Sequence, residues 1–217
     1  GTGIVRGLDG ELNLNEFMSD SNKNSKLKVI IGGSFVSKFN DDNKNPVFNL
    51  PKNVGASSLR FNLRYNKIRF NGEYVQKIND PYPDNQNEQF NYIYKNGEGL
   101  LFNLGYSTKG FALDFSAKHM DNMLWRSTNV NVGPTDLLIG YLPALTKQHT
   151  YNLAATLYPY ATNFYGEISY QADLLFKIPK KSILGGKYGT SVAINFATSY
   201  TPKRKFINDL VTIFSKK

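Results

Sequence analysis

The chain has 217 residues and no cysteine, and its 26 lysines and arginines outnumber its 17 aspartates and glutamates, giving a formal charge of +9. Without cysteine the chain cannot form a disulfide framework or a cysteine-based metal site. No run of about 18 apolar residues exists, which excludes a membrane-spanning helix. Many basic residues are spread one by one along the predicted strands, with a cluster at 203–205, so the charge does not indicate a nucleic-acid partner.

The first predicted elements are two strands, because apolar and polar residues alternate along them. We expect these strands at 3–14 and 27–39. A long connection rich in Asn, Asp, Lys and Pro follows at 40–56. Such a composition is typical of loops.

The next predicted element is a hairpin over 58–78, which turns at Asn66 and Lys67. Its alternation is strict, so one face of each strand is apolar and the other is polar. The apolar residues are Leu59, Phe61, Leu63, Tyr65, Ile68, Phe70 and Tyr74. The polar residues are Arg60, Asn62, Arg64, Arg69, Asn71 and Glu73.

A second loop is predicted at 79–97, followed by a hairpin over 99–118 that turns at 107–110. The longest predicted connection is 119–148, and it leads into a strand over 149–158.

After a short turn, the cleanest alternation of the chain predicts a strand over 164–178. A connection over 179–187 and a strand over 188–200 follow. The last piece, 206–214, fits a further strand better than a short helix.

Connection lengths largely alternate between long and short, and the predicted strands are about 9–13 residues long. Strands of soluble proteins average about 5–6 residues. We therefore predict an all-β fold, an antiparallel up-and-down transmembrane β-barrel with about nine or ten strands present. Residues 1–217 form this single domain or part of a larger barrel. A soluble β-sandwich is the alternative.

The barrel hypothesis assigns a face to each strand residue. The candidates for lining the lumen are Arg60, Arg64, Arg69, Glu73, Asp114, Glu167 and Asp173. The candidates for contact with lipid are Leu59, Phe61, Leu63, Ile68, Phe70, Phe102, Leu113, Phe115, Ile168, Leu174, Phe176, Ile194 and Phe196. The candidates for the membrane interface or for loop contacts are Tyr65, Tyr74, Trp125, Tyr141 and Leu142.

Two roles are open for the arginines of the 58–78 hairpin. They could select anions in a pore, or they could fill the lumen with ion pairs, such as one between Arg69 and Glu73 four residues apart. Trp125 is likewise either an interfacial anchor or a packing residue of a folded loop.

No catalytic, metal or cofactor site is predicted. The two histidines, His119 and His149, are 30 residues apart and lack the spacing of metal ligands. The glycines of 184–189 lack the lysine and serine or threonine that end a phosphate-binding loop. A turn whose glycines adopt positive φ fits them better.

Five segments of the chain carry a resemblance: 3–7, 121–127, 141–151, 158–161 and 184–190. Together they resemble an uncharacterised family of large Bacteroidota outer-membrane proteins, known as a domain of unknown function. The resemblance implies an outer-membrane barrel with further strands before Gly1, so that this chain is an internal part of a longer polypeptide. It brings no catalytic or ligand-binding residue with it.

The expected function is a structural or accessory subunit of an outer-membrane complex, in export or uptake. The long loops 40–56, 79–97 and 119–148 would dock other outer-membrane proteins, and the barrel would contact membrane lipid and lipopolysaccharide. The alternatives are a channel for a small solute, with an anion as the first choice, and a soluble binding module. No enzymatic activity and no nucleic-acid partner is expected.

Overall fold

The computed structural model of the chain describes ten stretches of residues. They are 3–16, 26–40, 51–78, 81–84, 91–94, 96–126, 139–140, 144–146, 162–163 and 165–202. Within them, no helix is long and apolar enough to cross a membrane.

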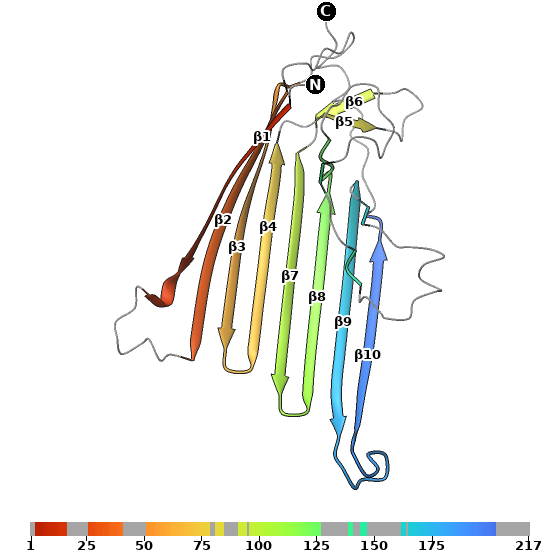
Figure 1. Cartoon of the computed structure of the whole chain (residues 1–217). Helices are drawn as coiled ribbons and strands as arrows, with labels where there is room; N and C mark the ends of the chain where they lie inside the picture. The colour runs from red at the N-terminus through yellow and green to blue at the C-terminus, as the bar shows by residue number, and fades with distance from the viewer. Residues whose placement is uncertain are drawn as a thin grey trace, which may run out of the picture.

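The main element is an antiparallel sheet of eight strands in the order β1-β2-β3-β4-β7-β8-β9-β10 (Figure 1). Its strands are β1 (Gly3–Asn13), β2 (Leu27–Asn40), β3 (Asn53–Tyr65), β4 (Ile68–Ile78), β7 (Gly97–Thr108), β8 (Phe111–Asp121), β9 (Gly166–Ile178) and β10 (Thr190–Tyr200). The remaining elements are the 3-10 turn η1 (Leu14–Glu16) and the two-stranded sheet of β5 (Pro81–Asp84) and β6 (Asn91–Tyr94).

The sheet is a simple meander, because each strand pairs with the strands that precede and follow it in the sheet along the chain. Two tight turns produce the central hairpins. Asn66, with a φ of 50°, turns β3 into β4, and Gly110, with a φ of 80°, turns β7 into β8. Asparagine and glycine are the residues that adopt positive φ at least cost.

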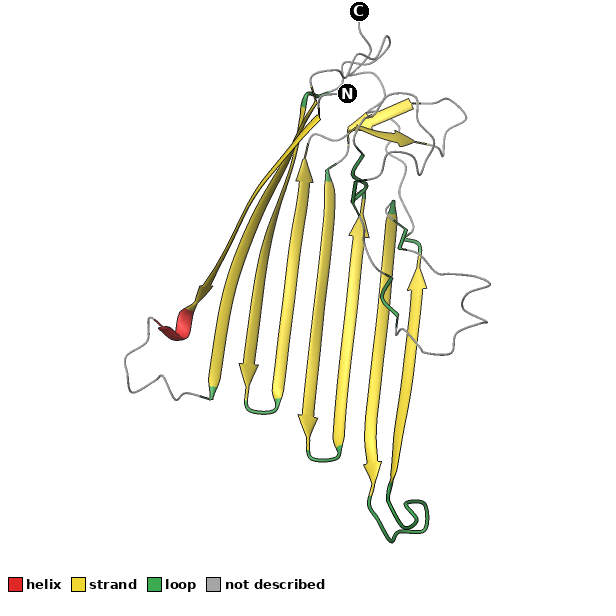
Figure 2. Cartoon of the chain, viewed as in Figure 1, coloured by secondary structure: helices red, strands yellow, loops and turns green. Residues whose placement is uncertain are grey.

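Three connections leave the sheet at one end, called the loop end, and four leave it at the other, called the turn end. The loop-end connections are 41–52, 79–96 and 122–165. The turn-end connections are 14–26, 66–67, 109–110 and 179–189. Figure 2 shows the hairpin turns side by side at the turn end. The predicted alternation of long and short connections therefore holds for the central hairpins and fails at β1–β2, because 14–26 is longer than the loop-end connection 41–52.

The strand ends step along the strand direction from β1 to β10 (Figure 1). At the turn end, β1 stops at Asn13, which lies opposite Ile30 of β2. β2 extends three residues further toward the turn end, to Leu27, and the level of Leu27 across the sheet is the reference. That level crosses β10, the last strand, at Ile194, four residues after its start at Thr190. Three and four make a shift of seven residues over the seven steps between eight strands, and Gly3 and Tyr200 are offset equally at the loop end.

The prediction of nine or ten strands differs from the eight-stranded sheet. The predicted strands 149–158 and 206–214 lie outside the described residues. β8 pairs directly with β9, so no strand lies between them. The predicted loop 79–97 contains the short β5–β6 hairpin.

The sheet is not closed into a barrel within the described residues, since β1 and β10 each pair with one neighbour. It is also a single layer, with little of the core that a soluble domain would have. The buried apolar side chains of the described residues are Val54, Ala117, Met120, Met123 and Leu124.

Candidate functional site

The register of the eight strands gathers alternate residues onto two faces of the sheet. The polar face carries all seven residues proposed for a lumen: Arg60, Arg64, Arg69, Glu73, Asp114, Glu167 and Asp173. The apolar face carries Tyr65 and Tyr74 and all thirteen residues proposed for contact with lipid. These thirteen are Leu59, Phe61, Leu63, Ile68, Phe70, Phe102, Leu113, Phe115, Ile168, Leu174, Phe176, Ile194 and Phe196.

The apolar face is exposed in the described structure. Leu8 is 77% exposed, Phe196 is 61% exposed and Leu59 is 59% exposed. A sheet in a soluble domain packs its apolar face on a second layer. Apolar surfaces of this breadth are typical of sites that contact a membrane or another protein.

A ladder of aromatic rings crosses the apolar face from β3 to β9. Its ring centroids are separated by 5.1 Å between Phe61 and Phe70, and by 6.4 Å between Phe70 and Phe102. The next steps are 6.0 Å to Phe115 and 6.4 Å from there to Tyr170. Ring pairs at these separations attract one another, so the ladder links neighbouring strands.

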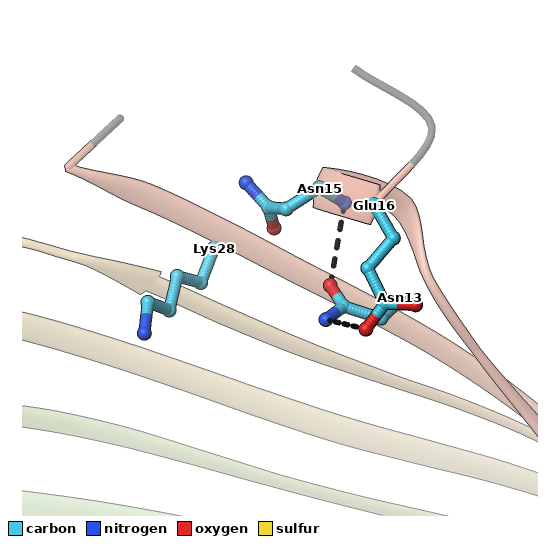
Figure 3. A pocket seen from close by; sticks show the side chains of 4 residues that line it. All are labelled: Asn13, Asn15, Glu16 and Lys28. Carbon is cyan, nitrogen blue, oxygen red and sulfur yellow. Dashed lines mark hydrogen bonds between the residues drawn. The ribbon is translucent and has the colours of Figure 1, made fainter. Parts of the chain in front are cut away.

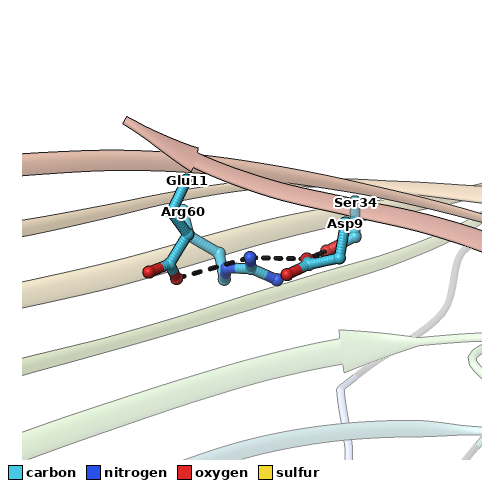
Figure 4. A network of polar contacts seen from close by, with 4 residues as sticks. All are labelled: Asp9, Glu11, Ser34 and Arg60. Atoms are coloured by element: carbon cyan, nitrogen blue, oxygen red, sulfur yellow. Dashed lines mark hydrogen bonds and ion pairs between the residues drawn. The ribbon is translucent and has the colours of Figure 1, made fainter. Parts of the chain in front are cut away.

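Arg60 forms the largest ion-pair network on the part of the polar face that the structure describes (Figure 4). Its guanidinium lies 2.6 Å from the Asp9 carboxylate and 3.5 Å from that of Glu11, and it donates to Ser34 Oγ at 2.5 Å. To reach β1 from β3, Arg60 crosses β2 at Gly32, where a Cβ would lie 3.2 Å from its guanidinium. Arg60 is thus held by its neighbours.

A second arginine crosses an intervening strand in the same way. Arg69 on β4 binds Asp114 on β8 at 2.8 Å, passing over Gly105 on β7. A Cβ at Gly105 would lie 2.6 Å from the Asp114 carboxylate. The predicted pair of Arg69 with Glu73 is absent from the described residues, because the glycine leaves space for the longer reach to Asp114.

One level of the polar face separates charge across the sheet, and we call it the charge row. Lys28, Arg64 and Arg69 occupy it on β2, β3 and β4, and Asp114 and Asp173 occupy it on β8 and β9. Two side-chain amides donate to Asp173, at 2.7 Å and 2.8 Å. Arg64 has no ion pair among the described residues and borders an open hollow of about 300 Å³. The row therefore presents a basic and an acidic half.

A second hollow, of about 380 Å³, lies where η1 meets β2 (Figure 3). Asn13, Asn15, Glu16 and Lys28 line it. Asn13 donates to Glu16 at 3.0 Å, and the Asn15 side chain both donates to and accepts from the backbone of β2. These bonds fix η1 to the sheet, which is a structural role.

At the loop end, residues 122–126 fold back onto the polar face, and we call them the inner segment. Lys38 donates to the backbone carbonyl of Arg126 at 2.5 Å, and Lys77 donates to that of Leu124 at 2.6 Å. Both lysines are nearly inaccessible, at 3% and 0% exposure. Because a buried ammonium must be hydrogen-bonded, these contacts hold the inner segment in place.

The inner segment lies very close to the sheet. The carbonyl oxygen of Asn122 would be 2.3 Å from a Cβ at Gly97, so only glycine permits this approach. Met120 and Val54 on the polar face are buried, as is Met123 of the segment. The loop-end half of the polar face is thus covered, while the charge row is open.

Lys118 and Glu167 form a buried ion pair beside the inner segment, at 2.9 Å. Lys118 also donates to Thr162 Oγ1 at 2.8 Å. Glu167 accepts from the Asn163 backbone N–H at 2.8 Å and from the Ser169 hydroxyl. Glu167, proposed from the sequence for a lumen, is 1% exposed and fully engaged.

The loop candidates lie partly within the described residues. Trp125 belongs to the inner segment, is half-buried, and accepts at its carbonyl from the Ile139 N–H at 3.1 Å. This backbone hydrogen bond joins the inner segment to residue 139. Tyr141 and Leu142 lie outside the described residues.

The described residues hold no group of three or more His, Cys, Asp or Glu side chains arranged for a metal. His119 lies near the loop end of the apolar face, with Nε2 3.3 Å from a Glu98 carboxylate oxygen. His149 lies outside the described residues.

A family model matches residues 1–214 of the sequence. The chain belongs to DUF6029. This designation is a family of unknown function, so membership of DUF6029 supplies neither an activity nor a ligand. No curated protein and no solved structure matches the DUF6029 chain.

The sequence interpretation of this DUF6029 chain missed the inner segment, the two lysines that bind it, and the buried Lys118 beside it. In the sequence, Lys77 and Lys118 are single basic residues of predicted strands. The available signal was their setting, since the polar face near them is apolar at Val54, Val75 and Met120. A lysine in apolar surroundings needs a partner, which a nearby backbone can provide.

Proposed function

We propose that the chain forms part of the wall of a transmembrane β-barrel in a bacterial outer membrane. In this proposal it is a structural or accessory subunit of an outer-membrane complex, in export or uptake, and has no catalytic role. The observation that carries the proposal is the one-sided apolar surface of a meander sheet with staggered strands.

The stagger supports a barrel because closure of a sheet requires a regular shift between strands. The shift here is seven residues over seven steps, or one residue per strand. At about 3.3 Å per residue along a strand and about 4.8 Å between strands, it corresponds to a tilt of about 35°. Membrane barrels have tilts of about 35–45°.

The apolar face supports placement in lipid. Eight strands of 11 to 14 residues are long enough to cross a bilayer when tilted. Because a sheet edge cannot remain unpaired in hydrocarbon, the proposal requires further strands between β1 and β10.

The inner segment favours a structural role over an open pore. It covers the loop-end half of the polar face and is held by Lys38 and Lys77. The long loop-end connections would then serve as docking surfaces for other outer-membrane proteins.

A pair of adjacent positions on β7 tests the proposal. The chain has no cysteine, so Phe102→Cys and Asn103→Cys each accept a single nitroxide label. In lipid vesicles we expect the label at 102 to collide with dissolved oxygen, which concentrates in lipid, and not with a water-soluble nickel chelate. The label at 103, on the opposite face, should show the reverse preference.

Three results would reject the proposal. A label at 102 shielded from both reagents would indicate a soluble sandwich, in which that face packs on protein. A label at 102 reached by the chelate would indicate that this face of the sheet is exposed to water. A protein that stays monomeric without detergent would indicate the same.

The second candidate function is a channel for a small anionic solute. The charge row favours it, because Arg64 is open to solvent and lies between Lys28 and Arg69.

A further inference from the structure

The connection between β9 and β10 is longer than its position requires. Residues 179–189 form it, and we call them the turn-end loop. Of the other three turn-end connections, 66–67 and 109–110 use two residues each, and 14–26 is long and contains η1. Two residues are sufficient to join antiparallel neighbours, so nine residues of the turn-end loop are not needed to close the β9–β10 hairpin.

The turn-end loop has a fixed shape. The Lys181 N–H donates to the Gly186 carbonyl at 2.7 Å, and the Ser182 hydroxyl donates to the Pro179 carbonyl at 2.7 Å. Gly185 is packed so tightly that a Cβ would lie 2.0 Å from the Pro179 carbonyl oxygen. The loop is therefore preorganised, and it would lose little conformational entropy on binding.

The fixed loop presents apolar side chains to solvent. Ile183 is 102% exposed, Leu184 is 75% exposed and Tyr188 is 73% exposed. Side chains of this kind, projecting from a rigid frame, act as anchors that fill pockets in binding partners.

The residues beside these anchors in the sequence are rich in lysine, and Lys187 Nζ lies 5.4 Å from the centroid of the Tyr188 ring. Lys177, Lys180, Lys181 and Lys187 are all exposed, and no aspartate or glutamate occurs between 174 and 190. The complementary surface therefore carries negative charge around an apolar recess.

We propose that the turn-end loop is a docking site for a partner protein that has an apolar pocket rimmed by carboxylates. The fixed shape favours a protein over an anionic membrane surface, because insertion into lipid depends on apolar area and charge rather than on one backbone conformation. This proposal goes beyond the membrane placement of the sheet and does not depend on it.

Crosslinking in the cells that make the protein tests the proposal. A photoreactive amino acid replaces Ile183 in the full chain, and we expect one discrete protein adduct. The adduct should disappear in the K180E/K181E/K187E background. It should persist with Lys109→Glu, which changes an exposed lysine of the neighbouring two-residue turn.

The crosslinked protein is then identified, purified and titrated against the purified chain. Ile183→Asp should weaken this binding by at least about tenfold. Added salt should weaken the binding of the wild-type chain. Because Ile183 is fully exposed, Ile183→Asp should keep the far-ultraviolet circular dichroism of the wild type.

Three outcomes would overturn the proposal. One is the absence of a protein adduct, and another is equal affinity of the identified protein for the wild type and Ile183→Asp. In the third, the wild-type chain binds vesicles of phosphatidylethanolamine and phosphatidylglycerol, and Ile183→Asp abolishes that binding. The identified protein meanwhile binds the wild type and Ile183→Asp with equal affinity. The third outcome would assign the loop to the lipid surface.

Discussion

At the scale of residues, buried charge is concentrated around the inner segment. Lys118 and Glu167 are 8% and 1% exposed, and each has a further partner besides the other. Removing one partner leaves an uncompensated charge, which costs more than the pair contributes. This asymmetry makes the pair a sensitive probe of the packing beside the inner segment.

We predict that Lys118→Met destabilises the protein by about 3–5 kcal/mol. The double variant Lys118→Met/Glu167→Gln should recover most of that loss, because the remaining groups are neutral. Lys177→Met, at an exposed lysine of β9, is the control and should change stability by less than about 0.5 kcal/mol. Denaturant titrations followed by circular dichroism measure all three, and equal effects of Lys118→Met and Lys177→Met would contradict the prediction.

The sequence predicted the face of each charged residue but not its partner. Alternation with a period of two is a local property, so it placed Arg60 and Arg69 on the polar side. Their carboxylate partners lie two strands away, and the contact depends on Gly32 or Gly105 in the strand between. Such a contact requires knowledge of the register, which no single strand contains.

At the scale of elements, the strands followed from the pattern and the inner segment did not. β3 begins at Asn53, five residues before the predicted start of its hairpin. Residues 54–58 are small or apolar on both faces, which hides the alternation. These residues need no polar side chains on the polar face, because the inner segment covers that part of the face in place of water.

We predict that Gly97→Ala displaces the inner segment, because its Cβ would meet the Asn122 carbonyl at 2.3 Å. With Met123→Cys as the only cysteine, labelling by a water-soluble maleimide should be slow in the parent and at least about tenfold faster with Gly97→Ala. Gly99→Ala is the matched control, since its Cβ would have no neighbour nearer than 3.9 Å. Equal labelling rates in the two alanine variants would show that the segment does not depend on this close approach.

At the scale of the whole molecule, the two faces and the two ends divide the sheet into regions of different chemistry. The polar face is covered at the loop end and charged at the turn end, and the apolar face is continuous. The alternation of residues does not predict that the polar face is divided. That division depends on a loop folding back, and alternation describes only the strands.

We predict that any current the protein carries across a planar bilayer prefers anions, because Lys28 and Arg64 face solvent on the charge row. Lys28→Glu/Arg64→Glu should shift the reversal potential toward cation selectivity. Lys109→Glu, at a turn, should leave the potential unchanged. Silent bilayers would remove the channel candidate and leave the structural one.

The direction of the two edge strands restricts how the sheet can be completed. β1 runs from the loop end to the turn end, and β10 runs the opposite way. The two edges are therefore already antiparallel to each other. If every neighbour in the closed barrel is antiparallel, the number of strands inserted between β10 and β1 must be even, whatever chain supplies them.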